Sequence, residues 1–247
     1  MKRRETREFY NQLAGSKRAK RGLSCGFQER YDPGELLKRP EILAQLRVII
    51  YRSLAGYKIP LHAVLDAGAG TFFYHEILED RFEQVFGLDC SKSMLSSGGD
   101  AIFAKAENRT VLCCGEVEHL PFPDNFFDCV FGMDVIHHLE NPTPVLSEAH
   151  RVLAPGGIFL GIEPNMQNPG MFLAHLLPAE ERGALRSNWP GRLRSLLSGQ
   201  FQDVKLGFYN LSVASGFSEK ANFFFPFSAS GGRGWSLRMV ITGKKAK

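Results

Sequence analysis

The chain of 247 residues lacks the features that mark membrane-spanning and secreted proteins. No apolar run approaches the roughly 18 residues that cross a bilayer, and the opening stretch Met1-Lys-Arg-Arg-Glu5 has no apolar segment typical of a secretory signal. The five cysteines include no Cys-x-x-Cys pair of the kind that binds zinc. We therefore expect a cytoplasmic protein with free thiols, no transmembrane segment and no metal centre.

Composition is ordinary for a soluble globular protein, with 44% apolar and 23% charged residues. The net charge of +4 is unevenly distributed, because the first 21 residues carry eight Lys or Arg and two Glu, a balance of +6 that leaves about −2 for the rest. Such a basic arm, which ends in Lys17-Arg-Ala-Lys-Arg21, either contacts nucleic acid or an anionic membrane, or forms a solvated terminal helix. Charge alone does not favour a nucleic-acid enzyme.

The length allows one large α/β domain or two small ones. Between Glu35 and Gly56, apolar residues recur at steps of three and four, which predicts a helix. Residues 1–58 are accordingly expected to form an N-terminal helical extension, and residues 59–247 the main domain.

From residue 61 onward, short apolar runs alternate with helix-compatible segments, the pattern of a doubly wound parallel sheet. The expected strands are His62–Leu65, Glu83–Leu88, Thr110–Cys113, Phe127–Gly132, Gly157–Ile162, Phe201–Phe208 and Trp235–Thr242. The expected helices are 73–80, 91–105, 142–153, 171–177 and 189–197. Several prolines between 164 and 190 indicate a lid or substrate insertion at about 164–200.

The stretch from His62 to Thr71 predicts a ligand site. Its apolar run ends in Asp66, and Gly68 and Gly70 follow, as in a buried strand whose tight turn lets backbone approach a ligand. Asp89 stands at the end of the next expected strand, where a carboxylate can accept both ribose hydroxyls of an adenosine cofactor. A dinucleotide is disfavoured, because Phe73 occupies the position of the third glycine in that fingerprint.

Two further stretches complete an ordered set. The first is Gly115-Glu-Val-Glu-His-Leu-Pro-Phe-Pro-Asp124, and the second is Asp134-Val-Ile-His-His-Leu139, followed by Pro155-Gly-Gly157. With these motifs in this order, residues from about 62 to 163 resemble the core of class I S-adenosylmethionine-dependent methyltransferases, in the broad group that methylates ubiquinone precursors, sterols and natural products. The resemblance implies a Rossmann-like, mostly parallel seven-stranded sheet with an antiparallel last strand, and S-adenosylmethionine as cofactor.

The resemblance also assigns cofactor-binding roles. It implies that the methionine end contacts Asp66, Gly68, Gly70 and Met133, that Asp89 holds the ribose, and that Cys90, Glu116 and Val117 surround the adenine. Two positions depart from the family pattern. Phe72 stands where the family often has a third glycine, so it either narrows the site or displaces the turn. Glu116 replaces the usual Asp.

Methyl transfer to an oxygen atom needs a general base, and histidine suits that role near neutral pH. His137 and His138, just past the fourth strand, are the candidates, although both could instead serve packing or capping. The apolar segments Met171–Leu177 and Ala221–Phe227 lie outside the cofactor core and favour a small lipophilic or aromatic substrate.

Two alternatives remain open. The first is methylation of RNA or protein with the help of the basic arm, although no Asn-Pro-Pro-Tyr motif is present. The second is a protein that binds the cofactor without turnover, which the bulky Phe72 would explain.

Overall fold

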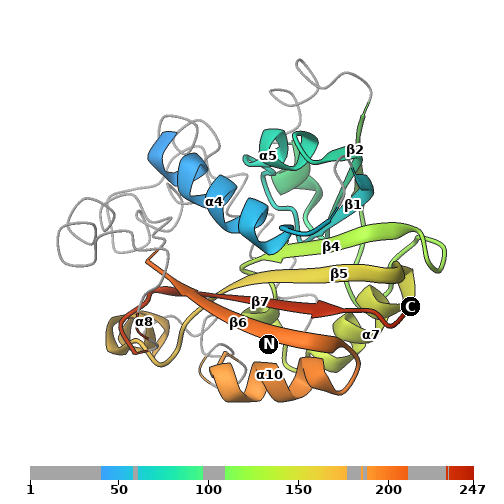
Figure 1. Cartoon of the computed structure of the whole chain (residues 1–247). Coiled ribbons are helices and arrows are strands. Elements are labelled where there is room, and N and C mark those ends of the chain that lie inside the picture. The colour runs from blue at the N-terminus through green and yellow to red at the C-terminus, as the bar shows by residue number, and fades with distance from the viewer. Residues whose placement is uncertain are drawn as a thin grey trace.

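The computed structural model of the chain describes residues 40–57, 61–96, 109–176, 185, 188–210, 232 and 234–247. A seven-stranded sheet in the order β3-β2-β1-β4-β5-β7-β6 runs through the described part of the protein (Figure 1). The strands are β1 Leu61–Ala67, β2 Phe82–Asp89, β3 Thr110–Cys114, β4 Phe127–Met133, β5 Leu153–Pro164, β6 Gln202–Tyr209 and β7 Arg238–Lys244.

Strand direction confirms the expected sheet. The pairs β1–β2, β1–β4, β2–β3 and β4–β5 are parallel. The last strand, β7, pairs antiparallel with both β5 and β6. This is the mostly parallel, Rossmann-like arrangement with an antiparallel last strand that the motifs implied.

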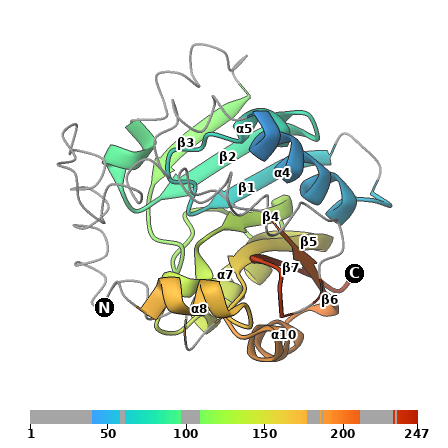
Figure 2. The ribbon, with the colours of Figure 1, turned by 90° about the vertical axis from the view of Figure 1, so that its left-hand side faces the viewer.

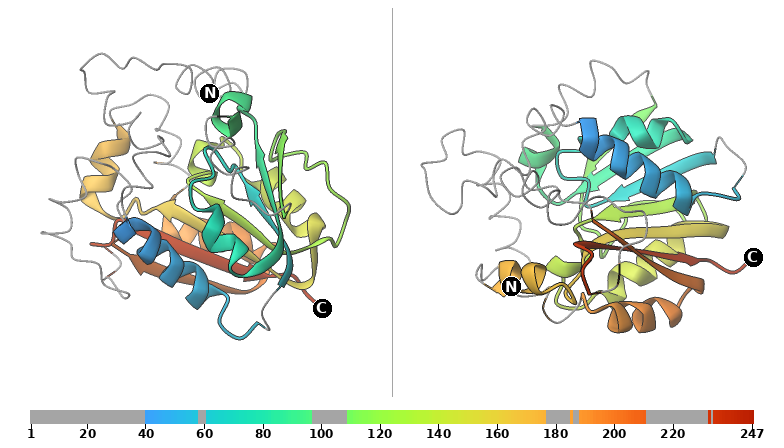
Figure 3. Two further views of the ribbon diagram at one scale, coloured as in Figure 1. Left: turned by 90° about the horizontal axis from the view of Figure 1, so that it is seen from above. Right: turned by 60° about the vertical axis from the view of Figure 1, so that its left-hand side comes forward.

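Helices cover both faces of the sheet (Figure 3). Helices α4 (Pro40–Ser53) and α5 (His75–Glu79) contribute to one apolar core, and α7 (Thr143–Val152) and α10 (Pro190–Ser198) contribute to the other. Side chains of β1 alternate between them, with Val64 in the first core and its neighbours Ala63 and Leu65 in the second. A strand buried on both faces is a continuous apolar run, which is why β1 was recognisable in the sequence.

Two short helices lie near the carboxyl ends of the strands: the 3-10 helix η1 (Ile136–His138) after β4, and α8 (Pro169–Leu176) after β5. None of the helices in the described ranges is long and apolar enough to span a membrane. Four cysteines are described, Cys90, Cys113, Cys114 and Cys129, and no disulfide joins any of them to another described residue.

The observed element bounds differ from the expected ones by a few residues. Among the strands, the largest shift is at β5, which begins at Leu153, before the expected Gly157. Strand β7 begins at Arg238 because Trp235 and Ser236 form a turn whose amides donate to the Gly232 carbonyl at 3.1 and 3.2 Å. The expected helix at 91–105 begins at residue 92, and its part beyond residue 96 lies outside the described residues. The basic arm and the segment Ala221–Phe227 also lie outside them. The domain boundary at residue 58 stays a prediction.

Candidate functional site

The carboxyl ends of β1, β2, β4 and β5 meet at one edge of the sheet, which faces the viewer in Figure 2. The connections after β1 and β4 lead to opposite faces there, and open α/β sheets bind ligands at such a switch point. Asp66, Asp89 and Met133 occupy the last or second-last positions of their strands. The fold therefore brings these three predicted site residues to the same edge.

The turn after β1 requires its glycines. Gly68 and Gly70 have φ angles of +83° and +55°, which favour glycine. A Cβ atom on Gly68 would lie 2.5 Å from Cγ2 of Val135, so close packing also excludes a side chain there. The amides of Gly68 and Ala69 donate to the Leu88 carbonyl at 2.7 and 3.0 Å, which fixes the turn against the end of β2.

Phe72 continues this turn with a φ of +55°, the backbone conformation that a glycine would supply. Its ring is fully buried in the core shared with α4 and α5, and contacts the rings of Tyr74 and His75 at centroid distances of 6.2 and 5.7 Å. The side chain thus points into the core, and the turn keeps the shape that glycine would give it. Phe72 neither narrows the site nor displaces the turn.

Asp66 is fully buried at the end of β1. Its Oδ1 accepts a hydrogen bond from the Tyr74 hydroxyl at 3.3 Å, whereas its Oδ2 accepts none from the residues that the structure describes. Burial raises the pKa of Asp66 well above its usual value, the Tyr74 hydrogen bond opposes this, and the nearby charge of Asp89 adds to it. Within the described part of the chain, the site thus holds a carboxyl group with no donor for one of its oxygens.

Asp89 is held by backbone amides. Gly70 N–H donates to its Oδ2 at 2.9 Å, and Ser91 N–H donates to its Oδ1 at 2.7 Å. Burial raises the pKa of Asp89, and these two hydrogen bonds partly offset the effect. The neighbouring Cys90 is half-buried, and its carbonyl lies 3.6 Å from Sγ of Cys114 at the end of β3.

The buried Tyr74 hydroxyl lies beside these carboxyl groups and donates to Asp66. The pKa of Tyr74 is raised well above its usual value, chiefly by burial and then by the charges of Asp66, Asp134 and Asp89. Asp66 and Asp89 therefore place two carboxyl groups at this edge of the sheet, an arrangement that suits a cationic ligand.

The end of β4 contributes strained backbone. Met133 is 9% exposed, and Asp134 has a φ of +60°, which is uncommon outside glycine. The Asp134 carboxylate accepts a hydrogen bond from the buried Arg238 guanidinium at the start of β7. Strained residues of this kind concentrate at functional sites.

Glu163, at the end of β5, organises the segment after β4 and was not singled out in the sequence. Its fully buried carboxylate accepts hydrogen bonds from the amides of Val135 and Ile136 at 3.0 and 2.7 Å, and from Nδ1 of His137 at 2.9 Å. Asn188 Nδ2 adds a further bond at 3.0 Å. The sequence did contain a signal for Glu163, since it ends an apolar strand just as Asp66 does.

The two predicted catalytic histidines differ in access. His137 is fully buried and is bound to Glu163, whereas His138 is half-buried. Their rings lie 3.8 Å apart, and His175 of α8 approaches the ring of His137 edge-on at 5.8 Å. A substrate can reach His138 more readily than His137.

Asp134, His137 and Glu163 each offer an atom that could bind a metal ion, and these atoms lie within 4.8 Å of one another. The Asp134 carboxylate, however, binds Arg238, and the Glu163 carboxylate accepts several N–H donors. The oxygens that a cation would use are therefore engaged in a hydrogen-bonded network. The expected absence of a metal stays a prediction.

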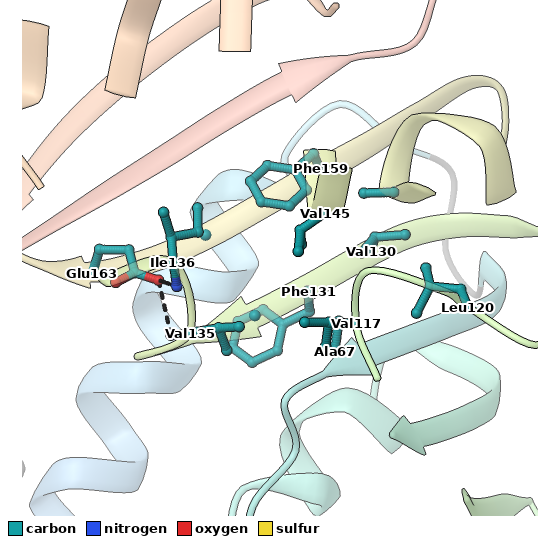
Figure 4. Close-up of a pocket in the computed structure, with 13 residues that line it drawn as sticks. Ala67, Val117, Leu120, Val130, Phe131, Val135, Ile136, Val145, Phe159 and Glu163 are labelled. Atoms are coloured by element: carbon teal, nitrogen blue, oxygen red, sulfur yellow. Dashed lines mark hydrogen bonds between the residues drawn. The ribbon is translucent and has the colours of Figure 1, made fainter. Parts of the chain in front are cut away.

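A small apolar cavity of about 20 Å³ lies beneath this edge (Figure 4). Ala67, Val117 and Val135 line it, and Glu163 stands at its side. That volume holds about one water molecule, so an adenosine ligand does not fit inside this cavity. The Val117 side chain points inward, while Glu116 beside it is exposed.

Comparison with known proteins identifies the central segment. Residues 65–161 match the family model described as a methyltransferase domain. The ubiquinone/menaquinone biosynthesis C-methyltransferase of Cupriavidus pinatubonensis is 34% identical over 107 residues, which cover 42% of this chain and 44% of the relative. The malonyl-[acyl-carrier protein] O-methyltransferase of Laribacter hongkongensis is 34% identical over 108 residues, which cover 39% of this chain and 35% of the relative. These matches span less than half of either relative.

A solved structure of phosphoethanolamine N-methyltransferase 2 from Haemonchus contortus, in complex with S-adenosyl-L-methionine, superposes with a TM-score of 0.63 at 18% identity. The superposition covers 87% of this chain and 57% of that one. At this level of identity the similarity shows the fold.

Because the backbone at Phe72 is left-handed, we predict that glycine at this position gives a more stable protein than alanine, the reverse of the usual order. Both Phe72→Ala and Phe72→Gly lose the buried ring, but only alanine keeps a Cβ at positive φ, a strain of about 1–2 kcal/mol. We expect Phe72→Gly to exceed Phe72→Ala in free energy of unfolding by about 1 kcal/mol, measured by urea denaturation. At Ala69, which has no positive φ, the Ala69→Gly variant should be less stable than the wild type. A more stable Phe72→Ala variant would contradict the strained turn.

Burial of Asp66 predicts a pH-dependent loss of stability in the ligand-free protein. The pKa of Asp66 is higher in the folded protein than in the unfolded chain, where it is about 3.9. The contribution of Asp66 to the free energy of unfolding is therefore full below the unfolded-state pKa. It is lost as pH rises through the folded-state pKa. Asp66→Asn stays neutral, so its stability relative to wild type should rise across this window by up to about 1.4 kcal/mol per pH unit. Urea unfolding at a series of pH values measures the difference. A wild type that gains stability over the variant with rising pH would refute the assignment.

Proposed function

Residues 65–161 are a methyltransferase domain of the class I S-adenosylmethionine-dependent superfamily, and on this premise we propose that the protein transfers a methyl group from S-adenosylmethionine to a small lipophilic or aromatic molecule. The observation that carries the proposal is the pair of carboxyl groups at the ends of the adjacent strands β1 and β2, the buried Asp66 and Asp89, whose Oδ2 binds the Gly70 amide of the glycine turn. Two carboxyl groups there favour a cationic ligand, and S-adenosylmethionine carries an ammonium and a sulfonium group.

The residues at the end of β1 and β2 fit this cofactor. An ammonium group would supply the donor that Oδ2 of Asp66 lacks among the described residues. Each oxygen of Asp89 holds one amide and keeps acceptor capacity for a ribose hydroxyl. Gly68 and Gly70 allow the cofactor to approach the backbone.

The remaining assigned contacts are part of the same proposal. Met133 would lie beside the methionine moiety, and Cys90, Glu116 and Val117 would surround the adenine. The inward orientation of the Val117 side chain leaves its backbone for contact with the ring. Glu116 is exposed, as a residue that meets the adenine amino group from the rim would be.

When bound, S-adenosylmethionine supplies an electrophilic methyl group on its sulfonium sulfur. The protein contributes alignment and exclusion of water. Val135 packs against the backbone of Gly68, and Glu163 binds the amides of Val135 and Ile136. These contacts hold the loop after β4 beside the turn after β1, so the parts of the site on the two strands keep a fixed geometry.

We assign the role of general base to His138 and a positioning role to His137. His137 is fully buried and its Nδ1 is bound to Glu163, so it fixes the short helix η1. His138 stacks beside it and is accessible to a substrate. A base is needed for an acceptor that loses a proton, such as a hydroquinone, but not for a carboxylate that is already ionised.

The acceptor that we propose is a small lipophilic molecule. The two relatives methylate different atoms in different molecules, carbon in one and oxygen in the other. Helix α8, which is free of charged residues and follows β5, favours a lipophilic acceptor. A cytoplasmic location, inferred from the free cysteines, belongs to this proposal too.

The buried Phe72 ring argues against a protein that binds the cofactor without turnover, because the sign for that alternative was a bulky residue in the turn. The alternative of RNA or protein methylation rests on the basic arm, which lies outside the described residues.

Calorimetric titration with S-adenosylmethionine tests the proposed cofactor site. Binding should be detected for the wild type, and Asp89→Ala should weaken it by about 1–3 kcal/mol through loss of charge-assisted hydrogen bonds. Glu83→Ala, on an exposed side chain of the same strand, is the matched control and should bind like the wild type. If Asp89→Ala binds with unchanged affinity, the ribose assignment is wrong. If the wild type does not bind at millimolar cofactor, the whole proposal is wrong.

Turnover separates the two histidines. Transfer of a radiolabelled methyl group to a prenylated hydroquinone should fall about 10²- to 10⁴-fold in His138→Gln, with little change in cofactor affinity, because a base acts in the transition state. Transfer to a malonyl thioester, whose carboxylate needs no base, should change little in this variant. Loss of hydroquinone turnover in His137→Gln alone, in a protein of wild-type stability, would reassign the base.

A further inference from the structure

Both tryptophans of the chain are exposed, in segments that adjoin helix α8. Trp235 is 66% exposed and Trp189 is 40% exposed, while Leu173 and Leu176 of α8 are 59% and 43% exposed. We call these four residues the Trp–Leu patch. Large apolar side chains exposed together in this way mark an interaction surface.

Direct contacts place the segments that carry Trp189 and Trp235 beside helix α8. The ring of Phe172 in α8 meets the ring of Trp189 edge-on at 6.4 Å, and Asn168 Nδ2 at the start of α8 donates to the Trp235 carbonyl at 2.8 Å. The indole N–H of Trp189 donates to the Leu185 carbonyl at 2.7 Å, so its polar atom is satisfied within the protein. The three segments therefore form one surface.

In the described segments that build the patch, the charged residues all have one sign. Described residues 165–176, 188–198 and 234–237, which build and flank the patch, contain no Asp, Glu or Lys. Their charged residues are Arg192 and Arg194, both exposed on α10. An apolar surface with basic residues at its edge and no carboxylate in these segments is complementary to an anionic, apolar partner.

We propose that the Trp–Leu patch docks on the surface of an anionic phospholipid bilayer. Tryptophan and arginine side chains suit the interface, because each combines an apolar body with a polar tip. Exposed leucines insert into the acyl boundary, and each arginine near an anionic surface adds about 1 kcal/mol of attraction. Contact is peripheral, since no described helix is long enough to span the membrane.

The Trp–Leu patch lies close to the candidate site, so docking on a bilayer would bring the site to the lipid. Helix α8 follows β5, whose last residues include Glu163 of the candidate site, and it lies beside the edge where the strands end (Figure 2). Docking through α8 would set that edge against the lipid, where a lipophilic acceptor partitions. The docking itself does not rest on the proposed methyl transfer, and each can be tested without the other.

The intrinsic fluorescence of Trp189 and Trp235 reports on docking of the full-length chain. Cosedimentation with vesicles of equimolar phosphatidylcholine and phosphatidylglycerol should capture the protein, and tryptophan emission should shift to shorter wavelength as the patch leaves water. Phospholipids brominated on their acyl chains should quench that emission. Absence of binding would overturn the proposal. Binding without an emission shift and without quenching would also overturn it, because the contact would then lie elsewhere, such as in the basic arm.

Variants identify which residues carry the contact. Leu173→Ser with Leu176→Ser should weaken partitioning by about tenfold or more, and Arg192→Gln and Arg194→Gln should each weaken it about fivefold. Val111→Ser, on an equally exposed apolar residue of edge strand β3, is the matched control and should partition like the wild type. Circular dichroism checks that each variant is folded.

Two results would reassign the surface. If neutralising Lys17 and Lys20 abolishes capture while the leucine variants bind as before, the arm and not the patch contacts the membrane. If the emission shift appears without lipid and follows a concentration-dependent dimer in sedimentation equilibrium, the patch covers a second copy of the chain. Either result contradicts bilayer docking.

Discussion

Burial of the Asp66 carboxylate at the end of β1 is the constraint on which the candidate site depends. A buried carboxylate is costly unless donors surround it, and Asp66 receives one hydrogen bond, from Tyr74. Arg238, a guanidinium in this region of the described structure, binds Asp134 and not Asp66. A cationic ligand would supply the donor that Oδ2 of Asp66 lacks among the described residues.

Two buried acids, at the ends of β1 and β5, have different partners although each follows an apolar strand. Glu163 ends β5 and accepts bonds from two amides, an imidazole and a side-chain amide, so its charge is fully solvated by the protein. Asp66 ends β1 with an oxygen that no described residue satisfies. Glu163, whose hydrogen bonds are satisfied within the protein, shapes the loop after β4. Asp66, which has an oxygen without a donor among the described residues, is suited to bind a ligand. Val135 links the two, because it donates to Glu163 and packs against Gly68.

The sheet was predictable from the sequence because strands buried on both faces appear as short apolar runs, and the turn after β1 because only glycine allows its backbone. Asp66 and Asp89 were predictable because strand ends meet at one edge. Arg238 was not, since its pairing with Asp134 joins residues 104 positions apart. The orientation of Phe72 was not predictable either, because a residue type does not reveal whether its ring turns toward the core or the site. Nor does a His-His pair show which ring is buried.

The central claim is that Asp66 provides the negative charge for the cofactor's ammonium group. Calorimetric titration with S-adenosylmethionine in buffers of different ionisation enthalpy, between about pH 5 and 8, counts the protons released on binding. Because burial raises the pKa of Asp66 in the free protein and an ammonium partner would lower it, binding should release protons in the wild type and none from this group in Asp66→Asn. Binding without proton release throughout that range, or equal release by the variant, would contradict the account.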